Sequence, residues 1–166
     1  RLFDGTKVRK DDPRVEAYGD VDELNSFIGA AAAFLLDEAL VAMLAGIQKD
    51  LFSLGAQLAD PASKGQELSK FQIPRERITA LENAIDMFET ELPPLRQFIL
   101  AGGGHGGAML HIARTVCRRA ERRVVGLSEK VEVNPSVIEY LNRLSDFLFV
   151  LARTVNHREG KQEILW

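Results

Sequence analysis

Apolar residues recur three or four positions apart along most of this chain, and that spacing is the feature that most constrains its fold. Residues spaced in this way share one side of an α-helix, so each series predicts a helix with one buried face. No segment alternates apolar and polar residues over the length of a useful strand. The chain is therefore predicted to be all-α, a five-helix antiparallel bundle that forms one domain over residues 1–166. The five series run from Leu24 to Leu35, Leu40 to Leu58, Ile78 to Phe88, Met109 to Leu127 and Ile138 to Val155.

Polar residues and prolines mark where these helices should begin and end. Asp20 is predicted to cap the first helix, with Asp22 and Glu23 in its opening turn, where the helix dipole favours negative charge. Residues 61–72 contain proline, serine and glycine and are predicted to form a loop. The remaining boundaries are expected at 37–38 and 60–61 for the second helix, at 74 and 93–94 for the third, and at 134–136 for the start of the fifth.

Composition excludes several classes of protein. The 166 residues carry a formal net charge of -3, which argues against a general nucleic-acid binder. A single cysteine, Cys117, rules out an internal disulfide framework and fits a reducing compartment, and the three histidines show no zinc-ligand spacing. No apolar run reaches the roughly 18 residues that span a bilayer, and no signal peptide is visible. We therefore expect a cytoplasmic protein that binds neither a membrane nor nucleic acid.

Five arginines fall within residues 114–123, although the chain as a whole is acidic. On a helix, Arg114, Arg118 and Arg122 stand at i, i+4 and i+8 and therefore line one face, where like charges repel. The planar guanidinium group suits phosphate oxygens, so the run suggests a polyphosphate site built on a helix. The alternative is a solvated basic face, or a set of arginines paired with carboxylates.

The glycine-rich segment 102–107 and a few polar residues near the arginines give weaker signals. The segment lacks the Gly-x-x-x-x-Gly-Lys-Ser/Thr pattern, so it is either a turn that leads into the fourth helix or an anion site at that helix's N-terminus. His111, Cys117, Asn142 and Asp146 are explained as well by packing or a solvent boundary as by chemistry. No Ser-His-Asp set, Cys-His set or close carboxylate pair is evident. A site here would therefore hold an anionic cosubstrate, while another molecule brings the nucleophile.

Three segments carry long and specific motifs in a fixed order. They are residues 10–26 (KDDPRVEAYGDVDELNS), residues 98–103 (FILAGG) followed by 110–122 (LHIARTVCRRAER), and residues 140–149 (YLNRLSDFLF). With the ending EILW at 163–166, they closely resemble the trimeric, PduO-type ATP:cob(I)alamin adenosyltransferase family over essentially the whole chain.

The resemblance implies a five-helix bundle assembled as a homotrimer, with ATP bound between subunits. The family transfers the 5′-deoxyadenosyl group of ATP to the cobalt of cob(I)alamin and releases triphosphate. The expected ligands are therefore ATP, Mg²⁺ and cobalamin (vitamin B12). A cob(II)alamin reductase and an adenosylcobalamin-dependent enzyme are the expected protein partners.

The resemblance also assigns roles to residues, with the catalytic ones falling to Phe98 and Arg118. Phe98 would lie under the corrin, where the family uses an aromatic residue to exclude the lower axial ligand. Without that ligand the cobalt is four-coordinate and easier to reduce to Co(I), the nucleophile that attacks C5′ of ATP. Arg114 would pair with Asp22 across the subunit boundary and help to seat the corrin. ATP, with charge developing on its leaving triphosphate, would be bound by Arg1, Lys10, Arg118, Arg119, Glu121, Arg122 and Asn142.

Two departures and two competing hypotheses accompany the resemblance. The family's Thr-Gly-Asp-x-Gly phosphate-binding segment is not present, because the sequence starts at Arg1 within the tail of that segment. Ala101 stands where the family usually has proline. One competing hypothesis is a non-catalytic cobalamin carrier or nucleotide-binding protein on the same scaffold. The other is a metal-carboxylate bundle, which needs paired Glu-x-x-His motifs that do not occur here.

Overall fold

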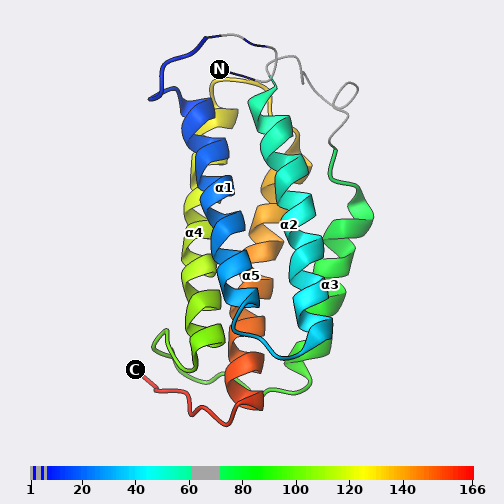
Figure 1. Cartoon of the computed structure of the whole chain (residues 1–166), viewed down its shortest axis with the longest axis vertical. Coiled ribbons are helices and arrows are strands. Elements are labelled where there is room, and N and C mark those ends of the chain that lie inside the picture. The colour runs from blue at the N-terminus through cyan, green and yellow to red at the C-terminus, as the bar shows by residue number, and fades with distance from the viewer. Residues whose placement is uncertain (1, 3–4, 6, 61–71) are drawn as a thin grey trace.

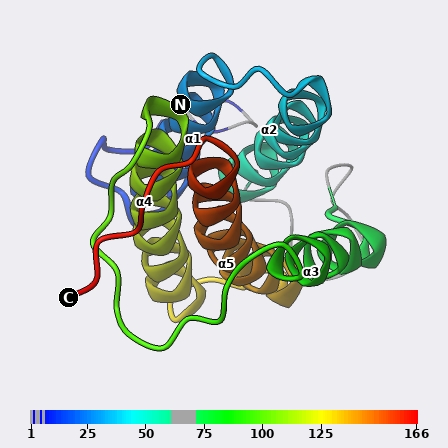
Figure 2. The same ribbon diagram turned by 90° about the horizontal axis from the view of Figure 1, so that it is seen from below.

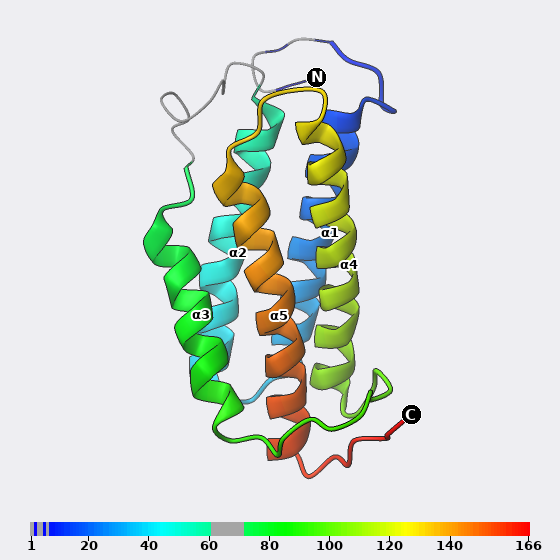
Figure 3. The same ribbon diagram turned by 180° about the vertical axis from the view of Figure 1, so that it is seen from behind.

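The computed structural model describes residues 2, 5, 7–60 and 72–166, and in this part the chain is an antiparallel bundle of helices (Figure 1). Successive helices run in opposite directions along one common axis, as Figure 3 shows from the other side. The one strand-like pairing within the described residues is a single bridge between Ile99 and Leu165. The all-α prediction is therefore confirmed. The helices are α1 (Pro13–Ala32), α2 (Glu38–Ala59), α3 (Arg75–Glu89), α4 (His105–Ser128) and α5 (Pro135–Arg158).

Helix α5 is the centre of the bundle. It packs against α4 on one side and α3 on the other, while α1 joins α4 to α2 (Figure 2). Fourteen of its 24 residues are buried, and over residues 150–156 every position is buried, polar ones included. The polar residues that it does carry are thus placed close to its neighbouring helices.

Helix α1 begins eight residues earlier than the sequence analysis predicted, with Asp12 rather than Asp20 as its N-cap. The Oδ1 atom of Asp12 accepts a hydrogen bond of 2.9 Å from the backbone N–H of Arg14, and Pro13 occupies the first helical position. A capping aspartate followed by proline is a stronger start signal than an isolated aspartate, because proline lacks the N–H that a first turn leaves unpaired. The prediction that Asp20 caps this helix is therefore wrong. Asp20, Asp22 and Glu23 lie within α1 instead.

The other predicted boundaries agree more closely with the structure. Asp37 caps α2 by accepting from the N–H groups of Ala39 and Leu40, and Asn134 caps α5 by accepting from Ser136. Helix α3 follows Pro74 as its N-cap and ends at Glu89, before the two prolines. Helix α4 already starts at His105, so the second half of the glycine-rich segment is helical. The predicted loop at 61–72 lies almost wholly outside the described residues.

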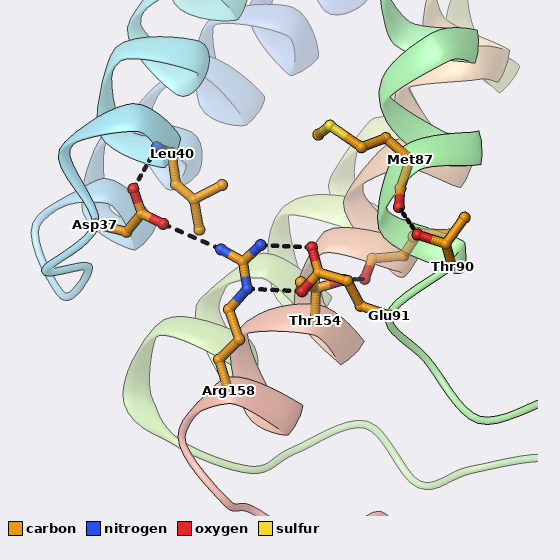
Figure 4. A network of polar contacts seen from close by, with 8 residues as sticks. Asp37, Leu40, Met87, Thr90, Glu91, Thr154 and Arg158 are labelled. Atoms are coloured by element: carbon orange, nitrogen blue, oxygen red, sulfur yellow. Dashed lines mark hydrogen bonds and ion pairs between the residues drawn. The ribbon is translucent and has the colours of Figure 1, made fainter.

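Arg158 ties three helix ends together at one end of the bundle (Figure 4). Its Nη1 atom lies 3.0 Å from Oδ2 of Asp37, and its Nε and Nη2 atoms donate to the two oxygens of Glu91 at 2.9 and 2.6 Å. The same guanidinium lies 5.5 Å from the ring centroid of Phe88. This network fixes the end of α5 relative to the start of α2 and to the segment that follows α3.

Helix α2 is the one helix, among the described residues, that is long and apolar enough to span a membrane by length and composition. Its apolar side chains Leu44, Leu51 and Leu54 are buried against the other helices. The bundle core therefore accounts for part of its apolar character, since 28% of its most apolar stretch is buried.

The burial pattern predicts where truncation is costly. Leu148, at the middle of α5, is 0% exposed, so Leu148→Ala should lower the free energy of unfolding by about 2–5 kcal/mol through lost burial and a residual cavity. Leu36, in the turn between α1 and α2, is 99% exposed and provides the matched control, with an expected change below about 0.5 kcal/mol. Urea denaturation of both variants measures the difference, and equal losses would contradict the assignment of α5 as the core.

Candidate functional site

A cleft with two connected parts runs between α4, α5 and the segment that precedes α4. One part has a volume of about 450 Å³ and the other about 330 Å³. Arg118 lines both parts, so the two parts adjoin at this side chain. The larger part is lined by Leu95, Phe98, Ile99, Arg114, Arg118, Ser145, Asp146 and Phe149. The smaller part is lined by Arg118, Glu121, Arg122, Val125 and Asn142.

The arginine run divides between two faces of α4. Arg119 contacts Asp20 and Glu23 on α1, and Arg123 contacts Glu16 on α1 at 3.0 Å. Arg114, Arg118 and Arg122 face the cleft, and no carboxylate among the described residues lies within ion-pair distance of them. The pairing with carboxylates that the sequence raised as an alternative is therefore found for Arg119 and Arg123, and the polyphosphate site stays a prediction for the other face of the helix. The cleft-facing set keeps its positive charge available for an anion.

Arg114 shows the energetic cost of this arrangement most clearly. The side chain is partly buried, its Nε atom has no hydrogen-bond partner among the described residues, and its guanidinium lies 5.7 Å from the ring centroid of Phe149. Burial, and then the neighbouring charge of Arg118, lower the pKa of Arg114. A carboxylate or another anion placed beside it would relieve both effects.

Glu121 on α4 and Asn142 on α5 form a polar edge of the smaller part of the cleft, beside Arg118 and Arg122. The Nδ2 atom of Asn142 donates to Oε1 of Glu121 at 3.0 Å, which joins α5 to α4. The Oδ1 atom of Asn142 accepts from Arg143 at 2.6 Å, and Arg143 also lies 2.9 Å from Asp146. The structure therefore brings together four residues that the sequence analysis predicted for ATP, namely Arg118, Glu121, Arg122 and Asn142.

The opposite end of the cleft is apolar. Phe98 is 78% exposed and meets the ring of Trp166 edge-on, with 6.4 Å between the ring centroids. Leu95, Ile99 and Phe149 complete the apolar wall around it. A flat apolar ligand and an anionic one could therefore lie side by side, with Arg118 between them.

Three of the described residues that were predicted from the sequence, Lys10, Asp22 and Arg119, do not line this cleft. Lys10 is exposed in the turn before α1, and Arg1 lies outside the described residues. Asp22 lies on the opposite side of α1 and lines a separate groove of about 380 Å³ between α1 and α2. Arg119, although close in sequence to Arg118, is occupied with the α1 carboxylates. One chain thus does not bring Asp22 to Arg114, in keeping with the prediction that they meet across a subunit boundary.

The sequence analysis did not assign two neighbours of the cleft, Phe149 and His111, to the site. Phe149 stands seven residues after Asn142, two helical turns along the same face of α5, so helical spacing could have placed it here. His111 is 3% exposed, its Nδ1 atom has no hydrogen-bond partner among the described residues, and its ring meets that of Phe149 at 6.1 Å. No sequence signal distinguishes such a histidine from an ordinary packed one.

Cys117, the one cysteine of the chain, is not available as a nucleophile. Burial raises the pKa of the Cys117 thiol well above its usual value, and the sulfur is 3.2 Å from the carbonyl oxygen of Leu141, so this cysteine is inert. No cluster of three or more His, Cys, Asp or Glu side chains that could hold a metal is found within residues 2, 5, 7–60 and 72–166. The site can bind, orient and neutralise charge.

Comparisons with known proteins agree with one another. Residues 1–155 match the family described as cobalamin adenosyltransferase. The corrinoid adenosyltransferase of Bacillus subtilis (strain 168) is 47% identical over 160 residues, which cover 94% of this chain and 81% of that protein. The human corrinoid adenosyltransferase MMAB is 42% identical over 168 residues, covering 99% and 67%. A variant of the PduO-type ATP:corrinoid adenosyltransferase from Lactobacillus reuteri, solved in complex with cobalamin and ATP, superposes with a TM-score of 0.92 at 38% identity, covering 100% of this chain and 92% of that one.

The environment of His111 predicts a dependence of stability on pH. Burial, and then the charge of Arg114, lower the pKa of His111 from 6.5 to about 4, with a small opposing effect from Glu163. Between pH 6.5 and 4 the unfolded chain therefore binds a proton that the folded chain does not. The free energy of unfolding thus decreases by up to about 3 kcal/mol as the pH is lowered through this range. Chemical denaturation of wild type and His111→Gln should show a steeper loss below pH 6.5 in wild type. If stability depends on pH equally in wild type and His111→Gln, the lowered pKa of His111 is contradicted. His157→Gln, at an exposed position, is the matched control.

Proposed function

This chain belongs to the cobalamin adenosyltransferase family, and on that premise we propose that the cleft between α4 and α5 is where it joins ATP to a corrinoid. The protein is an ATP:corrinoid adenosyltransferase: it transfers the 5′-deoxyadenosyl group of ATP to the cobalt of cob(I)alamin and releases triphosphate. The carrier hypothesis is not favoured, because the relatives are adenosyltransferases. The observation that carries the proposed site is a single cleft with unpaired guanidinium groups at one end and an exposed aromatic wall at the other.

At the basic end, Arg118 and Arg122 bind the triphosphate, and Glu121 with Asn142 orients the nucleotide. When Co(I) attacks C5′, its electron pair forms the Co–C bond while the C5′–O bond breaks, and the leaving triphosphate takes up the negative charge. Preorganised guanidinium groups stabilise that charge in the transition state. No proton has to be moved by the protein in this step.

Mg²⁺ is proposed to arrive with the nucleotide rather than to occupy a site of its own. The described residues hold no metal cluster, and Glu121 is the only carboxylate in the smaller part of the cleft. Mg²⁺ is commonly bound by one or two carboxylates together with substrate phosphates and waters, which fits this donor set. Bound there, it would add charge neutralisation on the triphosphate.

At the apolar end, Phe98 is proposed to lie against the lower face of the corrin. An apolar ring in that position offers no donor atom to the cobalt and leaves no room for a nitrogen ligand or water. Loss of the axial ligand makes cob(II)alamin easier to reduce, so the protein controls the cobalt through what it excludes. Arg114 is proposed to seat the corrin from the α4 side.

A homotrimer is proposed to complete the site. The groove beside Asp22 is mainly apolar and includes Phe52, whose side chain is 75% exposed on α2. Covering this surface with a second copy of the chain would bury Phe52 and place Asp22 of the partner subunit beside Arg114, which lacks a carboxylate partner in one chain. Arg1, Lys10 and Arg119 remain predicted nucleotide ligands, and a nucleotide held at the boundary between two copies is where they would act.

The proposed location is inferred from the cysteine content, and the proposed protein partners are inferred from the reaction. A buried free thiol and the absence of a second cysteine suit a reducing compartment, so we propose that the protein is cytoplasmic. A reductase would supply the electron that converts cob(II)alamin to cob(I)alamin. An adenosylcobalamin-dependent enzyme would consume the product.

The first prediction from this proposal concerns Arg118. Arg118→Ala should lower kcat/KM for adenosyl transfer by about 10²–10³, because a transition-state contact to the triphosphate is lost, while the fold remains intact since the side chain lies beside the core. Arg123→Ala is the matched control, because that arginine lies on the α1 face of the same helix. The corrin absorbance change on adenosylation measures both. Wild-type turnover in Arg118→Ala would remove this residue from the site.

The second prediction separates the two cobalt oxidation states. Phe98→Ala should slow the reaction from cob(II)alamin with a mild reductant by about tenfold or more, but should slow the reaction from chemically reduced cob(I)alamin much less. The reason is that the ring acts on the reduction step and not on the attack at C5′. Leu100→Ala, an exposed position in the same segment that does not line the cleft, is the control. Equal slowing from both oxidation states would contradict the role of Phe98.

A further inference from the structure

Two polar side chains near the end of α5 are buried but take no part in the chemistry described above. Arg153 and Asn156 are each 6% exposed and stand nearly one helical turn apart. A buried guanidinium is costly unless it is paired and hydrogen-bonded. Both residues find their partners in the irregular segment between α3 and α4, the segment that carries Phe98, or in the tail that follows α5.

Arg153 holds the beginning of that segment. Its Nη2 atom donates to the backbone carbonyl of Pro93 at 3.1 Å. The same guanidinium makes a two-point contact with Glu163 in the tail, Nε to Oε1 at 2.6 Å and Nη2 to Oε2 at 3.2 Å. One buried cation therefore connects α5, the start of the Phe98 segment and the tail.

Asn156 holds the other end of the segment. Its Oδ1 atom accepts from the backbone N–H of Gly104 at 3.0 Å, and its Nδ2 atom donates to the carbonyl of Gly102 at 2.8 Å. Gly103 has a φ of +109°, and a Cβ atom built there would lie 2.2 Å from Oδ1 of Asn156. The glycine-rich stretch is thus explained by the close approach of Asn156, which only glycine at this position permits.

Between these two ends, the tail pairs with the segment backbone to backbone. Leu100 donates to the carbonyl of Ile164 at 2.8 Å, and Trp166 donates to the carbonyl of Phe98 at 2.9 Å. Figure 2 shows the tail passing beside the segment that leads into α4. Arg158 adds a further anchor just before Pro93, through Glu91 (Figure 4).

Phe98 itself is poorly held by its own packing. With 78% of the residue exposed and no helix around it, its position depends on the backbone on either side. That backbone is held by Arg153, Asn156 and the tail. A displacement of an ångström at a reacting centre is enough to change a rate substantially.

We propose that Arg153, acting through its contacts with Glu163 and Pro93 and together with Asn156, is a positioning residue that sets where Phe98 lies relative to the corrin. This inference rests on the proposed role of Phe98. The side chain of Arg153 touches neither substrate. Its loss affects the step that depends on Phe98, the reduction of cob(II)alamin, more than the attack of Co(I) on ATP.

The experiment compares Arg153→Lys and Glu163→Gln with wild type in the full-length protein. Lysine keeps the charge but cannot make the two-point contact, and glutamine keeps the shape but removes the negative charge. For each variant, kcat is measured from cob(II)alamin with a mild reductant and from chemically reduced cob(I)alamin. The kcat from cob(II)alamin divided by the kcat from cob(I)alamin should fall at least fivefold in both variants, and the KM for ATP should stay within twofold of the wild-type value.

A matched control variant and a fluorescence probe test whether Arg153 has a purely structural role. Arg77→Lys removes a partly buried two-point contact with Asp50 on the far side of the bundle, so it should lower the melting temperature without changing the ratio. Trp166 is the single tryptophan of the chain, so its fluorescence anisotropy, measured without cobalamin, reports whether the tail is held. The anisotropy should fall in Arg153→Lys and Glu163→Gln and stay at the wild-type value in Arg77→Lys.

The double variant Phe98→Ala/Arg153→Lys makes the outcomes distinguishable. If Arg153 acts through Phe98, the double variant has the same rate ratio as Phe98→Ala alone. If Phe98→Ala changes the ratio but Arg153→Lys and Glu163→Gln do not, the positioning role is overturned while the proposed function stands. If Phe98→Ala itself leaves the ratio unchanged, the proposed role of Phe98 fails and the positioning role fails with it.

Discussion

Three guanidinium groups on one face of α4 have no carboxylate within ion-pair distance among the described residues, and the rest of the proposed site is arranged around this charge. Arg114, Arg118 and Arg122 share that face because the helical repeat places every fourth residue in line. The same helix satisfies Arg119 and Arg123 with carboxylates from α1. The separation is geometric: one side of α4 meets an acidic neighbour and the other side meets the open cleft. Like charges kept together in this way are stabilised when an anion binds between them, so the cleft favours a polyphosphate.

The two ends of the cleft differ in chemical character, one being basic and the other apolar. Arg118 lines both ends, with Arg122 beyond it on one side and the ring of Phe98 on the other. Adenosyl transfer needs a nucleotide and a flat apolar macrocycle in contact, and it needs no proton transfer from the protein. In the proposed site the substrates supply the chemistry, while the fold would supply position, charge and the exclusion of a donor from the cobalt.

Much of this could be predicted from the sequence, because the relevant signals are local. Apolar spacing gave the helices, Asp37 and Asn134 marked two of their starts, and the spacing of the arginines placed Arg118 and Arg122 on one face. The start of α1 was missed because two aspartates, Asp12 and Asp20, both fit a cap, and the adjacent proline decided between them. The sequence pattern could not predict contacts between segments that are distant along the chain. Nothing in the spacing pairs Arg119 with α1, and nothing places Trp166 against Phe98, since both depend on how separate elements pack.

The most direct test of the central claim is a structure of the protein with ATP and cobalamin bound. The account predicts triphosphate oxygens within about 3 Å of the guanidinium groups of Arg118 and Arg122, with the ribose C5′ turned toward the corrin and Phe98 against the opposite corrin face. A nucleotide lodged in the groove between α1 and α2, with the arginine face of α4 unoccupied, would contradict it.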